Sequence, residues 1–512
     1  MGADDSRTER HKIVIIGSGF GGIGMGIGLR KTGFDDFVIL EKATDLGGTW
    51  RDNRYPGCAC DVPSPLYSFS YQLNPDWSRL FAPQQEIWEY LRGCAAKYGI
   101  DEHIRYGNRV ESMEWDDADR RWTVRTADGK RYRAHAVVSG AGALHIPSYP
   151  EIPGIDASGG DSFHSSRWDP AVSLAGKRVA VIGTGASAIQ LVPAVATQAA
   201  RLTVFQRTPP WIQPRPDVAI SPGTRAALRA APGAARALRY AVYWAMETRA
   251  LGFAVDPRLM ASMEGMARKH LERQVADPGL RTRLTPDYTI GCKRILLSSD
   301  YYPALQRPNV DLVTDPIGAV TPSGVVTADG VTHEADVLIF ATGFRVVDAA
   351  TELNVTGRGG VKLGDAWAAC VEAYRGVTVP GFPNFFLLLG PNTGLGHTSV
   401  VFMIETQVQH VLSCLRILSR QKGGTIEARQ LASRKYNDSL QRRLRRAVWS
   451  AGGCRSWYLD DAGVNRAIWP GFSFEYWART RRARRRDYDV GALPAGRGRP
   501  QVAWRDRITP LV

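Results

Sequence analysis

The sequence predicts an α/β fold that contains two Rossmann-like domains, with a helical insertion in the second. The first observation is a strand, a glycine turn, a helix and a strand over residues 12–42, which is the order of a parallel βαβ unit. The second observation is that the same order returns over residues 178–207. Two such units in one chain indicate two related domains.

The segments between and after these units complete the prediction. Residues 113–142 alternate like a β-meander, and a similar stretch around residues 318–344 follows the second unit. An Ala- and Arg-rich stretch of helical character interrupts the second unit, and a strand, a glycine loop and a long helix follow Phe344. We therefore expect a first domain of residues 1–145 and 345–512, a second domain of residues 146–215 and 291–344, and a helical insertion of residues 216–290.

Length and composition are those of a multidomain globular protein. The chain has 512 residues, of which 44% are apolar and 22% are charged. Its richest apolar stretch, residues 240–255, is interrupted by Glu247 and Arg249, and residues 1–12 lack the apolar core of a signal peptide. We expect no integral membrane segment and a cytoplasmic location.

Charge and cysteine content exclude other classes of protein. The net charge is +15, but several arginines crowd into residues 479–486, which is typical of a solvated terminal segment, so we expect no nucleic-acid partner. Seven cysteines without a CxxC pair favour reduced thiols over a disulfide framework. The spacing of Cys58 and Cys60 suits neither a zinc site nor a redox pair, and we expect no metal.

The first glycine turn has the pattern of a dinucleotide-binding fingerprint. Gly17, Gly19 and Gly22 allow a tight turn and a close backbone approach to a pyrophosphate at the N-terminus of a helix. Glu41 ends the next strand, where a carboxylate accepts hydrogen bonds from the ribose hydroxyls. The turn alone is weak evidence, but its place between strand, helix and acidic residue favours nucleotide binding over a purely structural turn.

The second turn differs at the residue that reads the ribose. Gly183, Gly185 and Ala188 form the fingerprint, and Arg207 stands where the first unit has its glutamate. A guanidinium pairs with a 2′-phosphate, so this site predicts NADPH. The alternative is a surface arginine beside another hydroxyl acceptor.

Two nucleotide sites of different kinds indicate that electrons pass from NADPH to FAD. The first domain would then bind FAD and the second NADPH. A disulfide substrate would need a pair of redox cysteines beside the flavin, and the sequence offers none, so dioxygen is the expected electron acceptor.

Three segments resemble the type I Baeyer–Villiger monooxygenases, which are FAD-dependent enzymes. They are GGTWRDNRYPGCACD at residues 47–61, GDSFHSSRWD at residues 160–169 and DYTIGCKRILLSSDYY at residues 287–302. The second segment departs from the family at Ser158, where an aromatic residue is usual. Related N- and S-oxygenating enzymes usually carry Phe or Tyr at the place of Trp168.

The resemblance implies roles for particular residues. Arg294 would be the catalytic arginine, Asp61 its acidic partner, Lys293 a contact to cofactor phosphate, and Trp457 of SWYLD a neighbour of the nicotinamide nucleotide. Together with the two turns, the expected cofactor-binding residues are Gly17, Gly19, Phe20, Gly22, Glu41, Thr49, Trp50, Asp61, Tyr67, Gly183, Thr184, Gly185, Ala186, Ser187, Ala188, Arg207, Thr208, Lys293 and Trp457.

The implied reaction is insertion of one oxygen atom of O2 into a ketone, through a flavin C4a-peroxide and a tetrahedral adduct. A permanently charged guanidinium would stabilise both anions. For His164 and Trp168 we favour structural roles. Two alternatives stay open: an N- or S-oxygenating flavin monooxygenase, and a basic binding protein that uses a nucleotide fold. The sequence predicts neither the particular ketone nor the oligomeric state.

Overall fold

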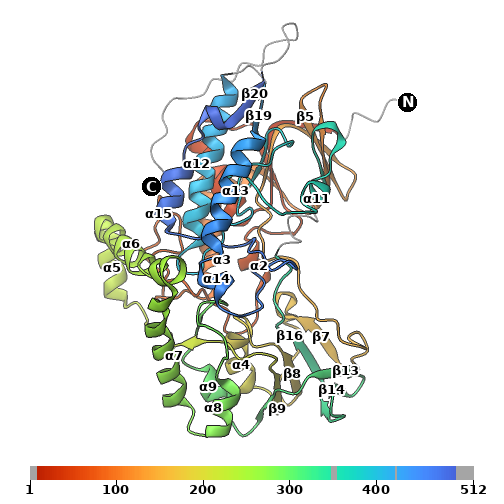
Figure 1. Ribbon diagram of the computed structural model, residues 1–512, viewed down its shortest axis with the longest axis vertical. Coiled ribbons are helices and arrows are strands. Elements are labelled where there is room, and N and C mark those ends of the chain that lie inside the picture. The colour runs from red at the N-terminus through yellow and green to blue at the C-terminus, as the bar shows by residue number, and fades with distance from the viewer. Residues whose placement is uncertain (1–7, 347–353, 421–423, 492–512) are drawn as a thin grey trace.

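The computed structural model describes residues 8–346, 354–420 and 424–491. Parts of the predicted segment 345–512 and of residues 1–12 therefore lie outside the described residues. Figure 1 shows two sheets at opposite ends of an elongated molecule, with the helices that follow residue 400 beside the first sheet. The α/β fold class predicted from the sequence is confirmed by this architecture and by the solved structures described below.

The first sheet contains eight strands in the order β17-β4-β5-β6-β1-β2-β3, with β18 paired to β6. Its centre is parallel, because β1 pairs with β2 on one side and β6 on the other, while β4, β5 and β6 form an antiparallel meander. The strands are β1 (Thr8–Ile16), β2 (Phe37–Leu40), β3 (Ile104–Arg105), β4 (Val110–Asp116), β5 (Arg121–Thr126), β6 (Arg131–Ser139), β17 (Asn354–Thr356) and β18 (Phe385–Leu387). Strands from both ends of the chain thus share one sheet.

Helices cover the centre of this sheet, where the strands become apolar: the last four residues of β1 and of β6 are buried. All four residues of β2 are buried, which is the pattern of a parallel strand covered on both faces. Helix α1 (Phe20–Lys31) follows the first glycine turn and packs against α3 (Gln84–Lys97) and the long α12 (Val400–Ser419). Fourteen of the 20 residues of α12 are buried, so this helix forms part of the core.

The second sheet has five parallel strands in the order β12-β9-β8-β16-β7. They are β7 (Asp161–His164), β8 (Arg178–Ile182), β9 (Arg201–Phe205), β12 (Val310–Val313) and β16 (Val337–Phe340). Helices α4 (Ala188–Ala196) and α9 (Tyr301–Leu305) pack together beside it. An antiparallel meander of β13 (Ile317–Thr321), β14 (Gly324–Thr327) and β15 (Thr332–Glu334) precedes β16.

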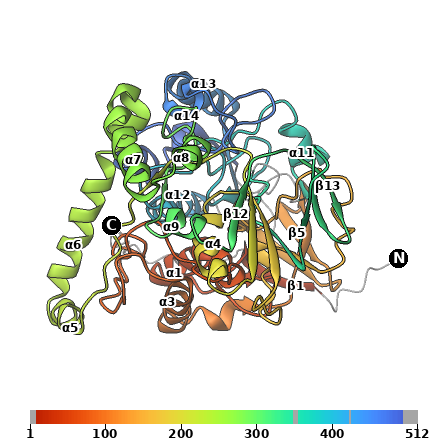
Figure 2. The same ribbon diagram turned by 90° about the horizontal axis from the view of Figure 1, so that it is seen from below.

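The stretch expected to be helical between the two parts of the second unit contains four α-helices: α5 (Pro222–Ala230), α6 (Pro232–Glu247), α7 (Met260–Gln274) and α8 (Pro278–Leu284). A π-helical turn, η4 (Leu251–Val255), and a 3-10 turn, η5 (Pro257–Leu259), separate α6 from α7. Figure 2, seen from below, shows α6 on one flank of the molecule, away from both sheets. The division of the chain into domains stays a prediction.

The inner face of α6 is fixed to the first unit by polar contacts. Arg239 is buried and donates hydrogen bonds to the carbonyl oxygens of Pro65, Leu66 and Ser68. Ser473 donates its hydroxyl to the buried carboxylate of Glu247 at 2.9 Å. The sequence pattern did not indicate that this helix lies against the first unit.

Short elements complete the described chain. A two-stranded sheet, β19 (Thr425–Ala428) with β20 (Tyr488–Gly491), brackets the C-terminal helices α13 (Gln430–Leu444), α14 (Val448–Ala451) and α15 (Ser473–Thr480). The others are α2 (Thr49–Asp52), η2 (Asp101–His103), η3 (Ser165–Arg167), β10 (Ile212–Gln213), β11 (Leu296–Leu297), η6 (Arg358–Gly360), α11 (Leu363–Ala366) and η7 (Arg485–Asp487). Within the described ranges, no helix has the length and apolar character needed to cross a bilayer.

Candidate active site

A single large cavity receives both glycine turns. Its volume is about 2030 Å³, about twice the upper end of the range of roughly 300–1,000 Å³ for a site that holds one small ligand. The first turn, the segment 47–61, the second turn and the segment that carries Lys293 and Arg294 all line it. A space of this size and lining is suited to two dinucleotides.

The first turn is closely packed against its surroundings. Gly17 has a φ of +87°, and a Cβ on Gly22 would lie 1.8 Å from the carbonyl oxygen of Gly17. Gly48 has a φ of +53°, and its added Cβ would approach the Cα of Gly19 to 3.2 Å. Only glycine fits these positions, so the motif at residues 47–61 packs directly on the fingerprint.

Glu41 follows β2 directly and is almost fully buried. Ser18 donates its backbone N–H and its hydroxyl to Oε2 of Glu41, at 2.9 and 2.7 Å, and Ala43 donates its N–H to Oε1 at 3.0 Å. Arg51 also donates to Oε1, at 2.9 Å. Burial by itself would raise the pKa of Glu41, but the charge of Arg51 and these hydrogen bonds outweigh it, so the pKa is lowered.

The second turn is more open. Gly183 has a φ of +112°, and a Cβ on it would lie 2.5 Å from the carbonyl oxygen of Ala341, but a Cβ on Gly185 would meet nothing within 4 Å. Thr184 donates its hydroxyl to the carbonyl oxygen of Thr208 at 3.1 Å. Ala188 is buried at the start of α4, behind the cavity wall.

Arg207 follows β9 and faces the cavity with an exposed side chain. Among the described residues it has no ion-pair partner. Lys293 lines the same cavity, and its pKa is lowered by burial and by the positive charge of Arg207. Two cations at one wall, neither of them in an ion pair among the described residues, fit a phosphate group.

Aromatic residues pack next to the first turn. Trp50, on α2, donates its indole N–H to the hydroxyl of Tyr67 at 3.1 Å. The ring of Tyr67 lies edge-to-face on Phe20, with centroids 5.3 Å apart, and Thr49 precedes Trp50 at the cavity. The expected residues of this segment are therefore brought together at one wall.

Arg294 and Asp61 form a bidentate ion pair at the cavity. Nε of Arg294 donates to Oδ2 of Asp61 at 2.6 Å, and Nη2 donates to Oδ1 at 2.7 Å. Their side chains are 30% and 28% exposed, and both line the cavity. The charge of Asp61 raises the pKa of Arg294 despite its burial, so the guanidinium is a fixed cation.

The two units meet beside this pair, through residues that the sequence analysis did not single out. Tyr55 donates its hydroxyl to Oε1 of Gln190 on α4 at 3.0 Å, and Gln190 donates its amide to the carbonyl oxygen of Ala59. Gly57 has a φ of +82°, and a Cβ on it would lie 2.5 Å from the carbonyl oxygen of Gln190. Asp61 is thereby positioned by a segment that both units contact.

The segment at residues 160–169 supplies an edge strand of the second sheet. β7 pairs with β16, and His164 at its end is buried and accepts a hydrogen bond from the backbone N–H of Ser166. Burial lowers the pKa of His164 to about 4. Trp168 packs edge-to-face on Phe163, and Ser158 is half-buried. His164 and Trp168 do not line the cavity, which supports structural roles.

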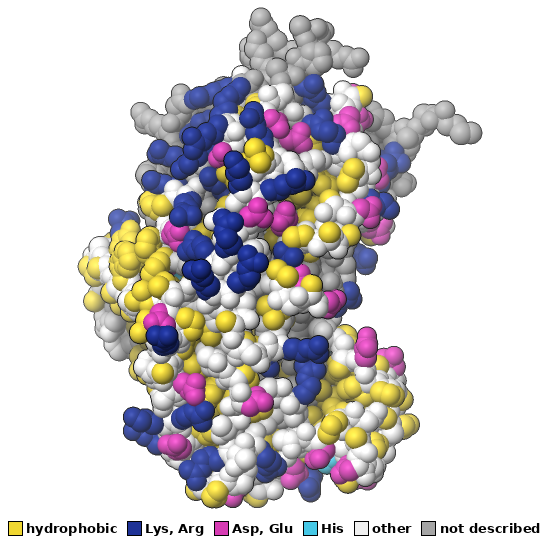
Figure 3. Space-filling model, in the orientation of Figure 1, with side chains coloured by type: hydrophobic (Ala, Val, Ile, Leu, Met, Phe, Trp, Pro, Cys, Tyr) yellow, Lys and Arg dark blue, Asp and Glu magenta, His cyan; other side chains and the backbone are white. Residues whose placement is uncertain are grey.

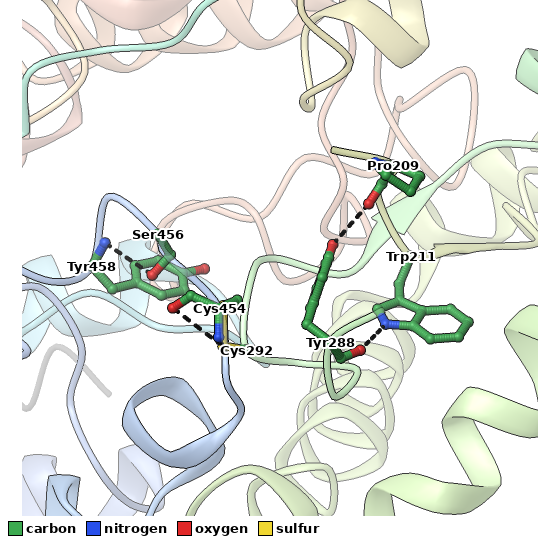
Figure 4. Close-up of a disulfide and its surroundings, with 7 residues drawn as sticks. All are labelled: Pro209, Trp211, Tyr288, Cys292, Cys454, Ser456 and Tyr458. Carbon is green, nitrogen blue, oxygen red and sulfur yellow. Dashed lines mark hydrogen bonds between the residues drawn. A yellow bond between two sulfur atoms is a disulfide. The ribbon is translucent and has the colours of Figure 1, made fainter. Parts of the chain in front are cut away.

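One cysteine pair corrects the expectation of reduced thiols. Cys292 and Cys454 form a disulfide between Cα atoms 6.1 Å apart, whereas Cys58, Cys60, Cys94, Cys370 and Cys414 are free. The bonded cysteines lie 162 positions apart, so no local spacing could reveal the pair. Figure 4 shows the disulfide beside Tyr458, with Tyr288 and Trp211 across the site.

The disulfide joins the segment of Lys293 and Arg294 to the loop of Trp457. Trp457 lines the cavity, is 47% exposed and contacts the ring of Tyr458. With it, every expected site residue lines the cavity except Gly22 and Ala188, which lie behind the two turns. Ser18 and Arg51 were not predicted from the sequence, although Arg51 directly follows Trp50 in the segment at residues 47–61.

Comparison with known proteins agrees with this geometry. A family model described as pyridine nucleotide-disulphide oxidoreductase matches residues 14–241. This model covers less than half of the chain, and together with the fold and the two glycine turns it indicates a nucleotide-binding oxidoreductase. A Baeyer-Villiger monooxygenase of Pseudomonas aeruginosa is 47% identical over 489 residues, covering 95% of this chain and 93% of that protein. The chain belongs to the Baeyer–Villiger monooxygenases and is a flavin-dependent monooxygenase, which confirms the resemblance found in its motifs.

Solved structures extend the similarity over the whole fold. A steroid monooxygenase bound to NADP has a TM-score of 0.84 and 29% identity, and the match covers 94% of this chain and 100% of that one. OTEMO in complex with FAD and NADP has a TM-score of 0.81 and 27% identity, with coverage of 94% and 99%.

Proposed function

We propose that this enzyme inserts one oxygen atom of O2 into a ketone and forms an ester or a lactone. The balanced reaction consumes one ketone, one O2, one NADPH and one proton, and it yields the ester, NADP+ and water. The observation that carries the proposal is the bidentate Arg294–Asp61 pair on the wall of a cavity that two dinucleotide turns share.

FAD and NADPH are the cofactors, and the chain offers each a separate cradle. The turn at Gly17 and Gly19, with Thr49, Trp50 and Tyr67, would hold FAD. The turn at Gly183 to Ser187 would hold NADPH, with Arg207 and Lys293 on its phosphates and Trp457 beside its nicotinamide part. Reduced by NADPH, the flavin supplies the activated oxygen.

Glu41 would bind the ribose of FAD through the hydrogen-bond acceptor capacity that remains on its carboxylate oxygens. Its two oxygens already accept four hydrogen bonds, from Ser18, Ala43 and Arg51. We therefore propose that Glu41 also fixes the shape of the turn by holding Arg51.

Arg294 acts as the catalytic residue in this proposal. A ketone attacked at its carbonyl carbon places negative charge on its oxygen, and a preorganised cation at the cavity wall stabilises that charge. Asp61 is a positioning residue, because its two oxygens fix the plane of the guanidinium. No residue has to remove a proton from the ketone.

The test is a panel of ketones supplied with NADPH and O2, with products scored by mass spectrometry for the gain of one oxygen atom. Arg294→Ala should keep FAD and lose ester formation by a factor of about 10²–10³ or more, while residual NADPH oxidation yields hydrogen peroxide. Arg201→Ala is a matched control, since Arg201 forms an ion pair with Asp311 far from the cavity lining.

Two outcomes would contradict the proposal. An Arg294→Ala enzyme that makes ester at the wild-type rate would remove the assigned role of the arginine. Oxygenation of an amine or a thioether, with every ketone of the panel unchanged, would favour the N- or S-oxygenating alternative.

A further inference from the structure

Helix α6 exposes several large apolar side chains and buries two of its three ionic ones, which an ordinary surface helix would expose. Surface helices normally turn an apolar stripe to the core and charged residues to water. On α6, Arg239 and Glu247 are 6% and 1% exposed, whereas Tyr240 and Trp244 are 48% and 54% exposed. Arg239 and Glu247 hold α6 against the rest of the protein, and large apolar side chains lie on its outer face.

This outer face continues into neighbouring segments. We define the outer patch by its exposed large apolar side chains: Leu238, Tyr240, Trp244, Leu251, Val255, Leu259 and Phe474. The ring of Trp244 lies 5.8 Å from that of Phe474, so α6 and the start of α15 share the surface. Figure 3 shows apolar side chains gathered over α5 and α6. Contiguous exposed apolar surface of this kind marks an interaction site.

The charges that flank the outer patch within residues 221–259 are mostly positive, and Glu475, next to Phe474, is paired with Arg443 and Arg479. Arg236, Arg249 and Arg258 are exposed beside it. Between residues 221 and 259 the only acidic residues are Glu247, which is buried, and Asp256, whose carboxylate caps the following turn. In Figure 3 the same face carries Lys and Arg side chains over the region of α12, α13 and α15. A partner for this face should therefore offer both an apolar region and negative charges.

We propose that the outer patch docks the enzyme on the surface of an anionic lipid bilayer, with α6 lying in the plane of the interface. Exposed Trp and Tyr suit the boundary between headgroups and acyl chains, and flanking arginines suit anionic headgroups. The described helices are too short or too polar to cross the membrane, so binding is peripheral and reversible.

A second copy of the chain fits the patch less well. A twofold contact through α6 would bring Arg236, Arg249 and Arg258 of one copy close to the same residues of the other. Exposed acidic residues that could pair with them are nearly absent from residues 221–259. Like charges across such a contact oppose association.

The experiment measures cosedimentation of the full-length, FAD-loaded enzyme with vesicles. One set contains phosphatidylcholine alone, and the other contains phosphatidylcholine and phosphatidylglycerol in about equal parts. We expect binding to the anionic set, loss of most binding at high salt, and much weaker binding to the neutral set.

Two groups of variants separate the apolar and the ionic contributions. Tyr240→Ser, Trp244→Ser and Leu251→Ser combined should lower binding by about 1000-fold, because each buried side chain contributes roughly ten-fold. Arg236→Gln with Arg258→Gln should lower it about 25-fold, at about five-fold for each arginine. Trp244→Ser alone serves as a milder variant if the triple variant does not fold.

Control variants carry comparable apolar-to-serine and cation-to-glutamine substitutions outside the outer patch. Val331→Ser with Val361→Ser alters side chains that are each 49% exposed, and Lys177→Gln with Arg307→Gln removes two exposed cations. Both controls should bind anionic vesicles like the wild type. Equal binding by wild type and Trp244→Ser, or no binding to anionic vesicles, would overturn the proposal. A wild-type dimer that the patch variants convert to a monomer would assign the patch to self-association instead.

Discussion

The two glycine turns have the same pattern but differ at the third fingerprint position and at the residue after the next strand. In the first turn, Gly22 has no room for a Cβ and Glu41 is held by four hydrogen bonds. In the second turn, Ala188 carries a Cβ, and Arg207 has no ion-pair partner among the described residues. The first turn is thus closed on itself and suited to a tightly held group, whereas the second is open and suited to a nucleotide that enters and leaves.

The largest effect should come from removing the carboxylate of the first turn. Glu41→Ala removes one of the two carboxylates that pair with the buried guanidinium of Arg51 and leaves Asp52, at 2.8 Å from Nε, as the other. Breaking one side of a buried pair costs up to about 3–5 kcal/mol of the free energy of unfolding. Urea denaturation measures the loss. Glu334→Ala, which removes an exposed partner of Arg178, should cost less than about 1 kcal/mol.

Acidification should reduce the difference in stability between the wild type and a variant without the Glu41 carboxylate. The folded pKa of Glu41 lies below its ordinary value of 4.5, so its carboxylate contributes stability that is present above that pH and lost as the pH falls through the folded pKa. The stability gap between wild type and Glu41→Gln should therefore narrow below about pH 4.5. A gap that widens on acidification would contradict the assigned ion pair.

A methyl group at the third position should also open the first turn. Gly22→Ala places a Cβ 1.8 Å from a backbone oxygen, so the helix has to move away from the turn. We expect a loss of about 3 kcal/mol in the free energy of unfolding, with FAD released on gel filtration. Gly185→Ala is the matched control, because its Cβ would meet nothing within 4 Å. Full FAD content in Gly22→Ala would show that the turn is less closed than described.

A substitution in the second unit should lower the affinity for NADPH and leave the free energy of unfolding unchanged. Arg207→Ala should weaken NADPH binding by about 1.5–3 kcal/mol, the range for a hydrogen bond to a charged group, and change NADH binding little. Titration of the dissociation constants of both nucleotides measures this. Equal weakening of both would mean that Arg207 does not bind the 2′-phosphate.

The smallest effect should come from exchanging the third residue of the second turn. Ala188→Gly should cost about 1 kcal/mol of stability, mostly from the added freedom of the unfolded chain. Thermal unfolding measures it. A loss of stability in Ala188→Gly as large as that in Gly22→Ala would contradict the proposed difference between the two turns.

The sequence was sufficient for features that depend on local order. The α/β class and both turns were predicted from local motifs, whereas the pairing of Arg294 with Asp61 was implied by the family resemblance; the structure places the turns and this pair at one cavity. Other contacts between distant segments were not predictable. From the sequence, Arg239 is expected to be an exposed helix residue, because its carbonyl partners near residue 66 are distant in the chain. The contact of Arg51 with Glu41 forms only when α2 is folded against β2.

The disulfide has a mechanical consequence for the cavity. Only three peptide units separate Cys454 from Trp457, and that length of chain reaches at most about 10 Å. While the sulfur atoms stay joined, Trp457 can therefore swing over the cavity mouth but cannot leave the neighbourhood of Cys292, two positions before Arg294. The disulfide therefore restrains the loop of Trp457, and a reducing agent would remove this restraint while leaving the backbone intact.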